Sequence, residues 1–369
     1  LRALRGRLSH GLMKKVLIAM SGGVDSSVAA YLMKQRGFDC IGVTMKLFAN
    51  EDIGISREHS CCSLDDVEDA RSVAYSLDMP YYVFNFSDRF ETDVIDRFIN
   101  AYENGITPNP CIDCNRYLKF DKLYMRAKEL GRDYVVTGHY ARVEKDENGR
   151  FLLKKALDDT KDQSYVLYCL TQEQLSHTIF PLGEMRKSQA REIAESQGFI
   201  NARKADSQDI CFVQNGSYAD FIEQYTGKNY PDGDFLDTNG NVIGRHKGVI
   251  RYTVGQRKGL GISAPEPLYV KAVNPVSNTV TLSYNDGLYS SIVKAGDINL
   301  ISVPEIKGEM RVKAKVRYRH TEQWATVTQN GETLTAVFDE PQRAVTCGQA
   351  LVLYDGDTVV GGGTIIEVE

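Results

Sequence analysis

The sequence lacks the features that mark several classes of protein. It has no apolar run that approaches the length of a transmembrane helix, which excludes a helical span within these 369 residues. Its net charge of −5 excludes a protein that binds nucleic acid over its whole surface, although local basic strips remain compatible with it. Its eight cysteines lack the spacing of a disulfide-rich domain. They favour a reducing cytoplasm in which a few thiols serve chemistry.

Hydrophobic periodicity divides the chain near residue 216. Before it, runs of strand length alternate with segments of helical period, which predicts a Rossmann-like parallel sheet with helices on both faces. After it, short alternating runs broken by Gly, Asn, Asp and Pro predict two small β-rich or β-barrel domains. We expect a catalytic α/β domain over 13–216, a central β-rich domain over 217–295 and a C-terminal β-barrel over 296–369. Residues 1–12 are basic and lead into no secretory apolar stretch, so we expect a disordered extension there.

Periodicity within these domains predicts individual elements. Apolar positions at helical spacing predict helices over 90–103 and 117–130. Apolar runs of strand length are expected to form strands over 134–137 and 249–254. In the first domain, the carboxyl ends of the parallel strands are the edge where ligands should bind.

A glycine-rich segment, Ser21-Gly22-Gly23-Val24-Asp25-Ser26, joins a predicted buried strand to a predicted helix. Glycines allow unusual backbone angles and close approach, and the free N–H groups of a helix start attract anions. The segment is neither G-x-x-x-x-G-K-[ST] nor G-x-G-x-x-G, which disfavours an ordinary P-loop and a dinucleotide site. An ordinary tight turn capped by Ser21 is the alternative. The hydroxyl groups and the carboxylate gathered in this turn favour a phosphate-binding loop instead.

Two other segments place cysteines among polar, loop-like residues. Cys111 and Cys114 form a C-x-x-C pair in a Pro-rich turn before a helix, and Cys211 follows Asp-Ser-Gln-Asp-Ile. A cysteine at a helix N-terminus has a lowered pKa, and the thiolate is its reactive form. Any single cysteine can instead be a small buried hydrophobe. That default applies to Cys40, Cys169 and Cys347.

Five motifs appear in order along the chain. They are Asn-Pro-x-x-x-Cys-Asn at 109–115, Thr-Gly-His-Tyr at 137–140, Lys-Asp-Gln-Ser-Tyr at 161–165, Asp-Ser-Gln-Asp-Ile-Cys-Phe at 206–212 and Gly-Gln-Arg-Lys-Gly-Leu-Gly at 255–261. Together with the loop at 21–26, they resemble the tRNA-specific 2-thiouridylase family of the ATP pyrophosphatase superfamily. The resemblance extends from about Met13 to the C-terminus.

The resemblance implies an ATP-dependent tRNA sulfurtransferase. ATP would adenylate the C2 oxygen of wobble uridine 34, and sulfur from a cysteine persulfide would replace it, giving 2-thiouridine, AMP and pyrophosphate. Cys211 matches the residue that receives the persulfide from a sulfur relay protein or a cysteine desulfurase. Cys114 matches its partner thiol, and a Cys114–Cys211 disulfide can result. Mg²⁺ is the implied cofactor beside ATP, with Asp25 as its candidate ligand.

The resemblance also implies binding residues. For ATP these are Ala19, Met20, Ser21, Gly22, Gly23, Val24, Asp25, Ser26, Met45 and Gly138. For the target base they are Asn109, Pro110 and Cys111. For the rest of the tRNA they are His139, Lys161, Asp162, Gln163, Arg317, Tyr318 and Gln349. Taken alone, His139 is better interpreted as a satisfied buried histidine.

One position departs from the family pattern. Many members carry Asp where this chain has Cys111, so an acidic group near the uridine is missing, and Asp113 lies on a different side of the turn. Cys111, Cys114 and Cys211 could then ligate an iron–sulfur cluster with one open iron. This cluster is a hypothesis separate from the redox-thiol mechanism.

A basic segment near the C-terminus predicts an RNA-binding surface. In a strand over 310–318, alternate side chains share one face. Those alternate positions carry Arg311, Lys313, Lys315, Arg317 and Arg319. The stretch 244–262 adds five further Lys and Arg residues without an acidic one. A solvated strand face is the alternative, but like charges side by side repel each other, which favours phosphates as the partner.

Two rival functions account for part of the pattern. An ATP pyrophosphatase that amidates a small substrate would explain the loop but neither the cysteines nor the basic strand. A module that binds RNA and keeps a relic nucleotide site would explain the basic strand but leave the loop without a use. An assay for AMP and for sulfur incorporation separates them.

Overall fold

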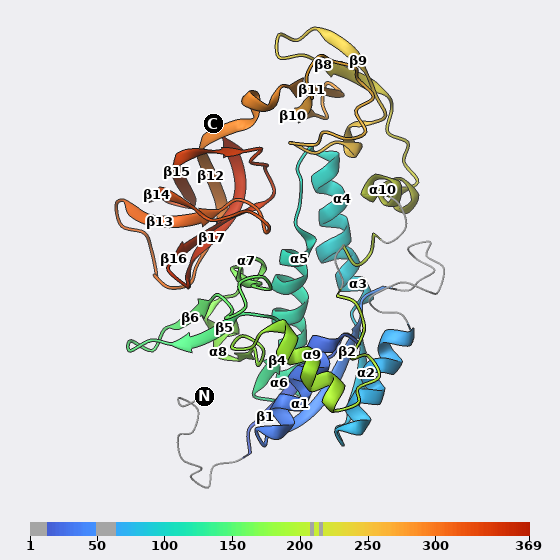
Figure 1. The fold of residues 1–369 in the computed structure, drawn as a ribbon, viewed down its shortest axis with the longest axis vertical. Coiled ribbons are helices and arrows are strands. Elements are labelled where there is room, and N and C mark those ends of the chain that lie inside the picture. Colours follow the sequence, from blue (N-terminus) through green and yellow to red (C-terminus); the bar gives the residue numbers. More distant parts are fainter. Residues whose placement is uncertain (1–12, 49–63, 207–209, 214–216) are drawn as a thin grey trace.

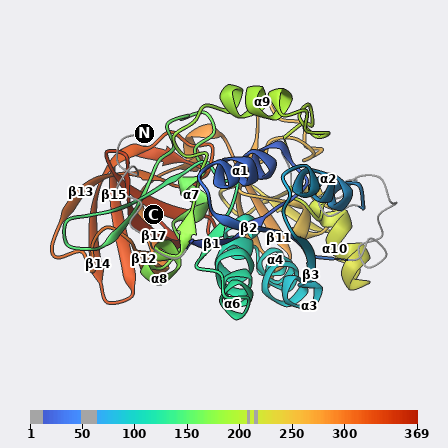
Figure 2. The same ribbon diagram turned by 90° about the horizontal axis from the view of Figure 1, so that it is seen from below.

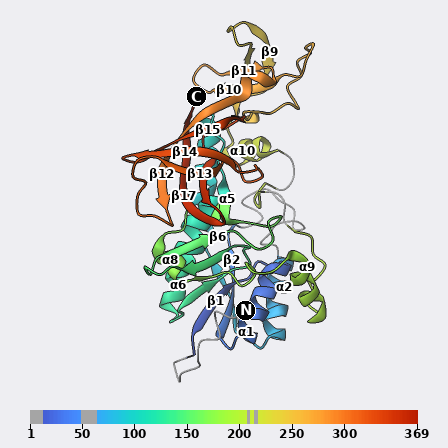
Figure 3. The ribbon, with the colours of Figure 1, turned by 60° about the vertical axis from the view of Figure 1, so that its left-hand side comes forward.

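The computed structural model describes residues 13–48, 64–206, 210–213 and 217–369, so the extension expected over 1–12 lies outside the described residues. The chain forms an α/β domain, a small central sheet and a barrel (Figure 1). Figure 3 shows the elongated molecule from the side. The small sheet, which is central only in the sequence, lies at one end, the barrel lies in the middle and the α/β domain lies at the other end.

The sheet of the α/β domain is parallel throughout, as the sequence predicted. In spatial order the strands are β3 (Tyr81–Asn85), β2 (Asp39–Lys46), β1 (Lys15–Ala19), β4 (Tyr134–Val136) and β7 (Thr178–Ile179). Most residues of β1, β2 and β4 are buried between helices on the two faces, whereas β3 at the edge has no buried residue.

Helices cover both faces of this sheet (Figure 2). Side chains alternate along β1, so Val16 and Ile18 pack toward one group of helices and Leu17 toward the other. The first group is α1 (Val24–Gln35), α2 (Leu64–Ser76) and α9 (Lys187–Ser196). Among the helices opposite, α6 (Leu123–Glu129) packs directly on the sheet.

Two long helices connect the α/β domain to the rest of the molecule, and each contains a π-helical segment. The first joins α3 (Ser87–Phe90), the π-helical η1 (Glu91–Ile95) and α4 (Asp96–Glu103). The second joins α5 (Pro110–Asp113), the π-helical η2 (Cys114–Lys122) and α6. The second helix was predicted over 117–130 but begins seven positions earlier, because Pro110 occupies the first helical position, where its missing N–H costs nothing. Cys114 therefore lies inside a helix and not in a loop.

The central part contains a four-stranded sheet preceded by α10 (Tyr218–Thr226). The strand predicted over 249–254 is wrong: Val249–Arg251 forms a short 3-10 turn, η3. Val249 and Tyr252 pack into the core of the four-stranded sheet, whereas Ile250 packs against α10 in a different cluster. The alternating pattern of apolar residues therefore reflects a turn whose side chains enter two cores, and not a strand. In spatial order the strands are β10 (Tyr269–Asn274), β11 (Thr279–Ser283), β8 (Gly233–Leu236) and β9 (Val242–His246).

The C-terminal part is a closed barrel, as expected, because β12 pairs with both β15 and β17. β12 crosses the domain boundary expected between residues 295 and 296 and pairs with barrel strands on both sides of it. Around the barrel the strands are β12 (Tyr289–Leu300), β15 (Thr333–Arg343), β14 (Gln323–Asn330), β13 (Met310–Lys315), β16 (Ala350–Asp355) and β17 (Thr358–Val368).

A hairpin from the α/β domain extends the barrel sheet through one pairing between Lys154 and Thr358. Its strands are β5 (Arg142–Lys145) and β6 (Phe151–Lys154). The remaining short helices are α7 (Ser164–Leu167), α8 (Gln172–Ser176) and η4 (Asn285–Leu288). No helix in the described part of the chain is both long and apolar enough to cross a bilayer.

Candidate active site

The glycine-rich loop lies where the order of strands in the parallel sheet changes direction. The chain leaves β1 for β2 on one side and later enters β4 on the other side of β1. In such sheets the crevice at the carboxyl ends of these strands is the ligand site. The loop follows β1, Thr137–Tyr140 follow β4, and Met45 lies near the end of β2, so three groups of predicted ATP-binding residues reach one edge.

Two glycines allow this edge to form. Gly22 has φ +75°, and a Cβ there would lie 2.4 Å from the backbone oxygen of Asp66. A Cβ on Gly138 would lie 2.8 Å from backbone atoms of Asp25 and Ser26. A side chain at either position would overlap these backbone atoms. Gly22 therefore lets Asp66 approach the loop, and Gly138 lets the segment after β4 approach the start of α1.

The serines of the loop have different roles. Ser26 and Ser27 are buried, and both hydroxyl groups donate to the carbonyl of Gly23 at 3.0 Å. The N–H of Ser21 donates to the Ser26 hydroxyl at 3.2 Å, while the Ser21 side chain is exposed. Ser26 therefore braces the loop, and Ser21 is the hydroxyl that faces solvent. The remaining predicted ATP-binding residues, Ala19, Met20, Gly23 and Val24, form the backbone path from β1 into α1.

Asp25, in the first turn of α1, is held by two side chains from distant parts of the sequence. Lys187 donates from Nζ to both carboxylate oxygens at 2.7 Å, and the hydroxyl of Tyr140 donates to Oδ1 at 2.8 Å. Lys187 also lies 2.8 Å from a carboxylate oxygen of Asp206. Sequence reasoning identified Asp25 but missed Lys187, since no motif contains this lysine.

A second lysine, Lys204, lies next to the glycine-rich loop. Lys204 pairs with Asp66 at 2.6 Å and with Asp69 at 2.7 Å. The side chain of Asn201 donates to the carbonyl of Gly22 at 2.8 Å and to the Ser27 hydroxyl at 2.9 Å. These contacts fix the loop from the segment that precedes Cys211, and sequence reasoning missed them as well.

The two cysteines predicted to carry the chemistry pack against one apolar cluster. Cys114 is 8% exposed and belongs to a cluster with Phe98 and Phe212, and Cys211 is half-buried against the same cluster. Leu47, just beyond the carboxyl end of β2, belongs to it too. Both cysteines therefore contact one cluster, which extends to the carboxyl end of β2. Cys111 is exposed.

Two predicted tRNA-binding residues, Gln349 and Tyr318, connect the barrel to the α/β domain at the seam between the two. Gln349 of the barrel donates to the carbonyls of Thr107 and Pro108 at 3.0 and 3.1 Å, directly before the turn at Asn109. Tyr318 donates from its hydroxyl to the backbone oxygen of Asp162 at 3.2 Å. Burial raises the pKa of Tyr318, and Asp162 and Cys111 nearby add to the rise.

The Lys161–Gln163 segment is itself a scaffold. The side chain of Asp162 accepts from the N–H groups of Ala156 and Ser164. The side chain of Gln163 accepts from the N–H of Tyr140 at 2.9 Å. Lys161 pairs with Asp206 at 2.9 Å. The side chains of Asp162 and Gln163 thus fix the backbone at Ala156, Ser164 and Tyr140 through hydrogen bonds.

His139 lies in an aromatic pocket. Its ring packs between Phe120 and Phe180, and Nδ1 lies 2.6 Å from the Thr137 hydroxyl. Burial lowers the pKa of His139 well below its usual value, and Lys119 adds to this effect. Its imidazole is therefore neutral at pH 7, so it offers no charge to a phosphate.

The prediction of five cations on one strand face is wrong beyond Lys315. β13 ends there, and Arg317 turns inward and donates to the Thr346 hydroxyl at 3.1 Å. Burial lowers the pKa of Arg317. On β13, Val312 and Ala314 are buried as alternation requires, but Arg311 is paired with Asp339. Lys315 keeps the predicted character, and Lys313 keeps it in part, since its Nζ lies 3.9 Å from Glu322. The acidic partners come from other segments of the chain, which the one-dimensional pattern does not show.

Three of the five cations in the stretch 244–262 are paired in the same way. Arg245 pairs with Asp234 at 3.0 Å and Lys247 with Asp232 at 3.4 Å. Arg251 pairs with both Asp220 and Glu223 of α10. The lack of acidic residues inside the stretch was therefore a poor guide to its surface charge.

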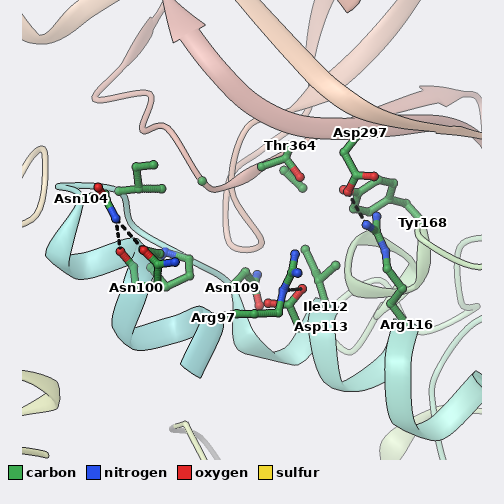
Figure 4. Close-up of a pocket in the computed structure, with 15 residues that line it drawn as sticks. Arg97, Asn100, Asn104, Asn109, Ile112, Asp113, Arg116, Tyr168, Asp297 and Thr364 are labelled. Carbon is green, nitrogen blue, oxygen red and sulfur yellow. Dashed lines mark hydrogen bonds and ion pairs between the residues drawn. The ribbon is translucent and has the colours of Figure 1, made fainter. Parts of the chain in front are cut away.

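A cavity of about 360 Å³ separates the second long helix from the barrel (Figure 4). Arg97 and Arg116 line its helical side, and Asp297 of β12 pairs with Arg116 across it. Asp113 also lines this cavity. Burial raises the pKa of Asp113 to about 6, against the lowering effect of Arg97 and Arg116.

Family models match the chain in three successive parts. They are described as a tRNA methyl transferase HUP domain at residues 14–215, a tRNA methyl transferase PRC-barrel domain at 219–284 and an aminomethyltransferase β-barrel domain at 290–365. The fold and these matches define the class: multidomain proteins in which a HUP nucleotide-binding domain precedes two β domains.

Curated relatives narrow the class. A protein of Clostridioides difficile named tRNA-specific 2-thiouridylase MnmA is 52% identical over 95% of this chain and 98% of its own length. Its namesake in Lachnoclostridium phytofermentans is 52% identical over 96% of this chain and 100% of its own length. A third, from Clostridium perfringens, is 49% identical over 95% of this chain and 98% of its own. The chain belongs to the tRNA-specific 2-thiouridylase family.

Proposed function

We propose that this protein is an ATP-dependent tRNA sulfurtransferase that converts wobble uridine 34 to 2-thiouridine in the cytoplasm. The observation that supports the proposal is that Cys114 and Cys211 both pack against one apolar cluster, which extends to the carboxyl end of β2. An ATP site alone would serve many reactions. Two cysteines beside a phosphate-binding loop specify sulfur as the nucleophile.

The first half-reaction activates an unreactive oxygen. The C2 oxygen of uridine attacks the α-phosphate of ATP, and pyrophosphate leaves with the bonding electrons. The loop 21–26 at the start of α1 would hold the leaving group through backbone N–H groups. Asp25 is the candidate Mg²⁺ ligand, but both of its oxygens accept from Lys187, so a Mg²⁺ ion would share this carboxylate with the ammonium. When bound, the ion would share the charge of the pyrophosphate.

The second half-reaction exchanges oxygen for sulfur. The terminal sulfur of a persulfide on Cys211 attacks C2, and AMP leaves with the former uridine oxygen. The thiolate of Cys114 then attacks Sγ of Cys211, which releases the sulfur on the base and forms a Cys114–Cys211 disulfide. A thiol reductant resets the pair. A sulfur relay protein or a cysteine desulfurase supplies the next persulfide.

The tRNA is the substrate that brings the base to this edge. Extruding a base from an anticodon loop costs little, because that loop is already unpaired. Asn109, Pro110 and Cys111 would contact the extruded base, and Cys111 is exposed for such contact. Gln349 and Tyr318 would act at the seam where they already bind the α/β domain.

An iron–sulfur cluster does not fit the described residues. No three His, Cys, Asp or Glu side chains within the described ranges lie where one metal ion could bind them. Cys111 is exposed while Cys114 is buried. We derive no step through a cluster. Stoichiometric iron and sulfide in anaerobically purified protein would reinstate this alternative.

The decisive experiment is mass spectrometry of tRNA nucleosides after incubation with ATP, Mg²⁺ and a persulfide donor. The wild-type protein should form 2-thiouridine and AMP in equal amounts. Cys211→Ser and Cys114→Ser should each lose thiouridine formation while tRNA affinity stays within about twofold, because the thiols act in chemistry and not in phosphate contact. Cys347→Ser, a half-buried barrel cysteine, is the matched control and should remain active.

Three outcomes would contradict the proposal. Normal 2-thiouridine formation by Cys211→Ser would disprove its persulfide role. AMP release with an amidated product but no sulfur would identify an amidating ATP pyrophosphatase. Intact tRNA binding by a wild-type protein that binds no ATP would leave only an RNA-binding module.

A further inference from the structure

Lys187 is a buried lysine whose three N–H donors all point to carboxylates. It is 8% exposed, and Nζ lies 2.7 Å from each oxygen of Asp25 and 2.8 Å from Asp206. Its backbone N–H is anchored separately, by a 2.9 Å bond to Asp158. The ammonium can therefore change partners while the backbone at the start of α9 stays in place.

The position of Lys187 matters because Asp25 lies in the first turn of α1, directly after the phosphate-binding loop. The N–H groups at this helix start attract phosphate, but a carboxylate in the same turn repels it. An ammonium on both oxygens of Asp25 cancels that repulsion. It also places a cation at the loop, where the glycines and the neutral serine hydroxyls provide none.

Asp206 can release Lys187 without becoming unpaired. Lys161 lies 2.9 Å from one of its oxygens and Arg191 lies 3.0 Å from the other. Burial alone would raise the pKa of Asp206, but hydrogen bonds from Lys187 and Lys161 outweigh it and lower the pKa to about 2. Two cations would thus remain on this carboxylate after Lys187 has turned away. Asp25 likewise keeps the hydroxyl of Tyr140.

We propose that Lys187 binds the β- and γ-phosphates of ATP, exchanging Asp206 for phosphate oxygens when the nucleotide enters. This inference rests on the proposed function only in requiring ATP as the nucleotide. Lys187 is then a substrate-binding residue for the leaving group, and Asp206 is the positioning residue that holds its ammonium beside the loop in the free protein. No bond is made or broken in the exchange, and the ammonium keeps its proton.

The test compares binding of α,β-methylene-ATP and of AMP by isothermal titration calorimetry on the full-length protein. Lys187→Met should weaken α,β-methylene-ATP binding about 10- to 100-fold, the contribution of a charge-assisted hydrogen bond, and weaken AMP binding less than about twofold. Lys187→Arg should recover part of the loss. Lys155→Met is the control, because Lys155 makes an equally short bond to a carboxylate, Glu322, at the barrel and away from the loop.

Lys187→Met leaves two carboxylates facing each other, so its fold could suffer. The double variant Lys187→Met/Asp206→Asn removes one charge of each sign and keeps the question answerable. Equal affinity of the double variant and the wild type for α,β-methylene-ATP overturns the inference, as does an equal loss for AMP and for the triphosphate. A wild-type protein that fails to bind α,β-methylene-ATP would instead refute the proposed function.

Discussion

Adjacent residues on the second long helix have side chains that point in different directions. The thiol of Cys114 is thereby separated from the carboxyl group of Asp113, the residue before it. Cys114 enters an apolar cluster shared with Cys211, whereas Asp113 faces the cavity at the barrel (Figure 4). Helical geometry produces this, since neighbours in sequence are about 100° apart around the axis. The raised pKa of Asp113 thus concerns the contact between domains rather than the thiols.

Asp113 should make the folding stability depend on pH. Its pKa is raised from 3.8 to about 6 in the folded protein, so the folded state holds the proton more tightly than the unfolded state. Stability from this group therefore falls as the pH rises from 3.8 through 6. Asp113→Asn should unfold with a free energy higher by at most about 3 kcal/mol at pH 8, by less at pH 5, and with no gain below the unfolded-state value.

Denaturant unfolding at pH 5 and pH 8 measures this effect. Asp121→Asn changes a half-exposed acid of the same helix and should alter stability by less than about 0.5 kcal/mol at either pH. A destabilised Asp113→Asn at pH 8 would show that the bond to Arg97, 3.7 Å long, outweighs the cost of burying the charge.

Other cysteines behave as the default interpretation predicts. Cys40 and Cys169 are buried, and burial raises their pKa to about 11 and about 12. At neutral pH both are protonated, and a protonated thiol is a poor nucleophile. Cys114 is buried as well, so burial by itself does not distinguish it from Cys40 and Cys169.

At the scale of single elements, β13 carries two lysines in place of the five cations expected. Lys313 and Lys315 are half-buried on one face of the strand, and the Lys313 ammonium lies over the Trp324 ring. Arg311 shares that face but is paired with Asp339. The ability of a strand face to bind RNA is thus decided by its neighbouring strands.

Charge reversal on β13 tests its contact with tRNA. Lys313→Glu/Lys315→Glu should weaken tRNA binding and reduce the slope of log affinity against log salt by about one to two, because each phosphate contact releases counterions. Binding titrations at several salt concentrations measure the slope. Arg311→Glu is the comparison and should change the slope less, since Asp339 already neutralises Arg311. An unchanged slope in the double variant would exclude β13 as a phosphate-binding surface.

At the scale of the whole molecule, Gln349 and Tyr318 of the barrel contact the α/β domain beside the candidate active site. Gln349 holds the carbonyls of Thr107 and Pro108, two residues before the helix that carries Cys111 and Cys114 begins. Tyr318 holds the backbone at Asp162 in the same way. The barrel is thereby connected to the turn that contains the proposed base-binding residues.

Gln349→Ala should separate these two roles. Losing two hydrogen bonds to backbone carbonyls should lower kcat/KM for tRNA about 5- to 150-fold, at about 0.5 to 1.5 kcal/mol per bond, and leave ATP affinity unchanged. Steady-state thiolation and ATP titration measure the two quantities. Gln329→Ala is the control, because Gln329 bonds only to barrel residues, Ile306 and Gly331. Equal effects of both variants would show that barrel stability, and not the seam, is responsible.

The sequence by itself determined the loop, the cysteine pairs and the order of domains, because these depend on residues that are neighbours along the chain. The glycines of the loop and Pro110 fix local backbone geometry wherever the chain goes. Periodicity identified the parallel sheet and the β-rich character of the C-terminal part. It failed over 249–254, where one apolar run serves two cores.

Tertiary structure alone decided which charges cancel. Asp25 meets Lys187, Arg311 meets Asp339 and Arg317 turns inward, and none of these contacts follows from spacing along the chain. An ion pair needs two side chains to be brought within a few ångströms by the packing of separate elements. The sequence determines which charged side chains are present, whereas the fold determines which of them pair with one another.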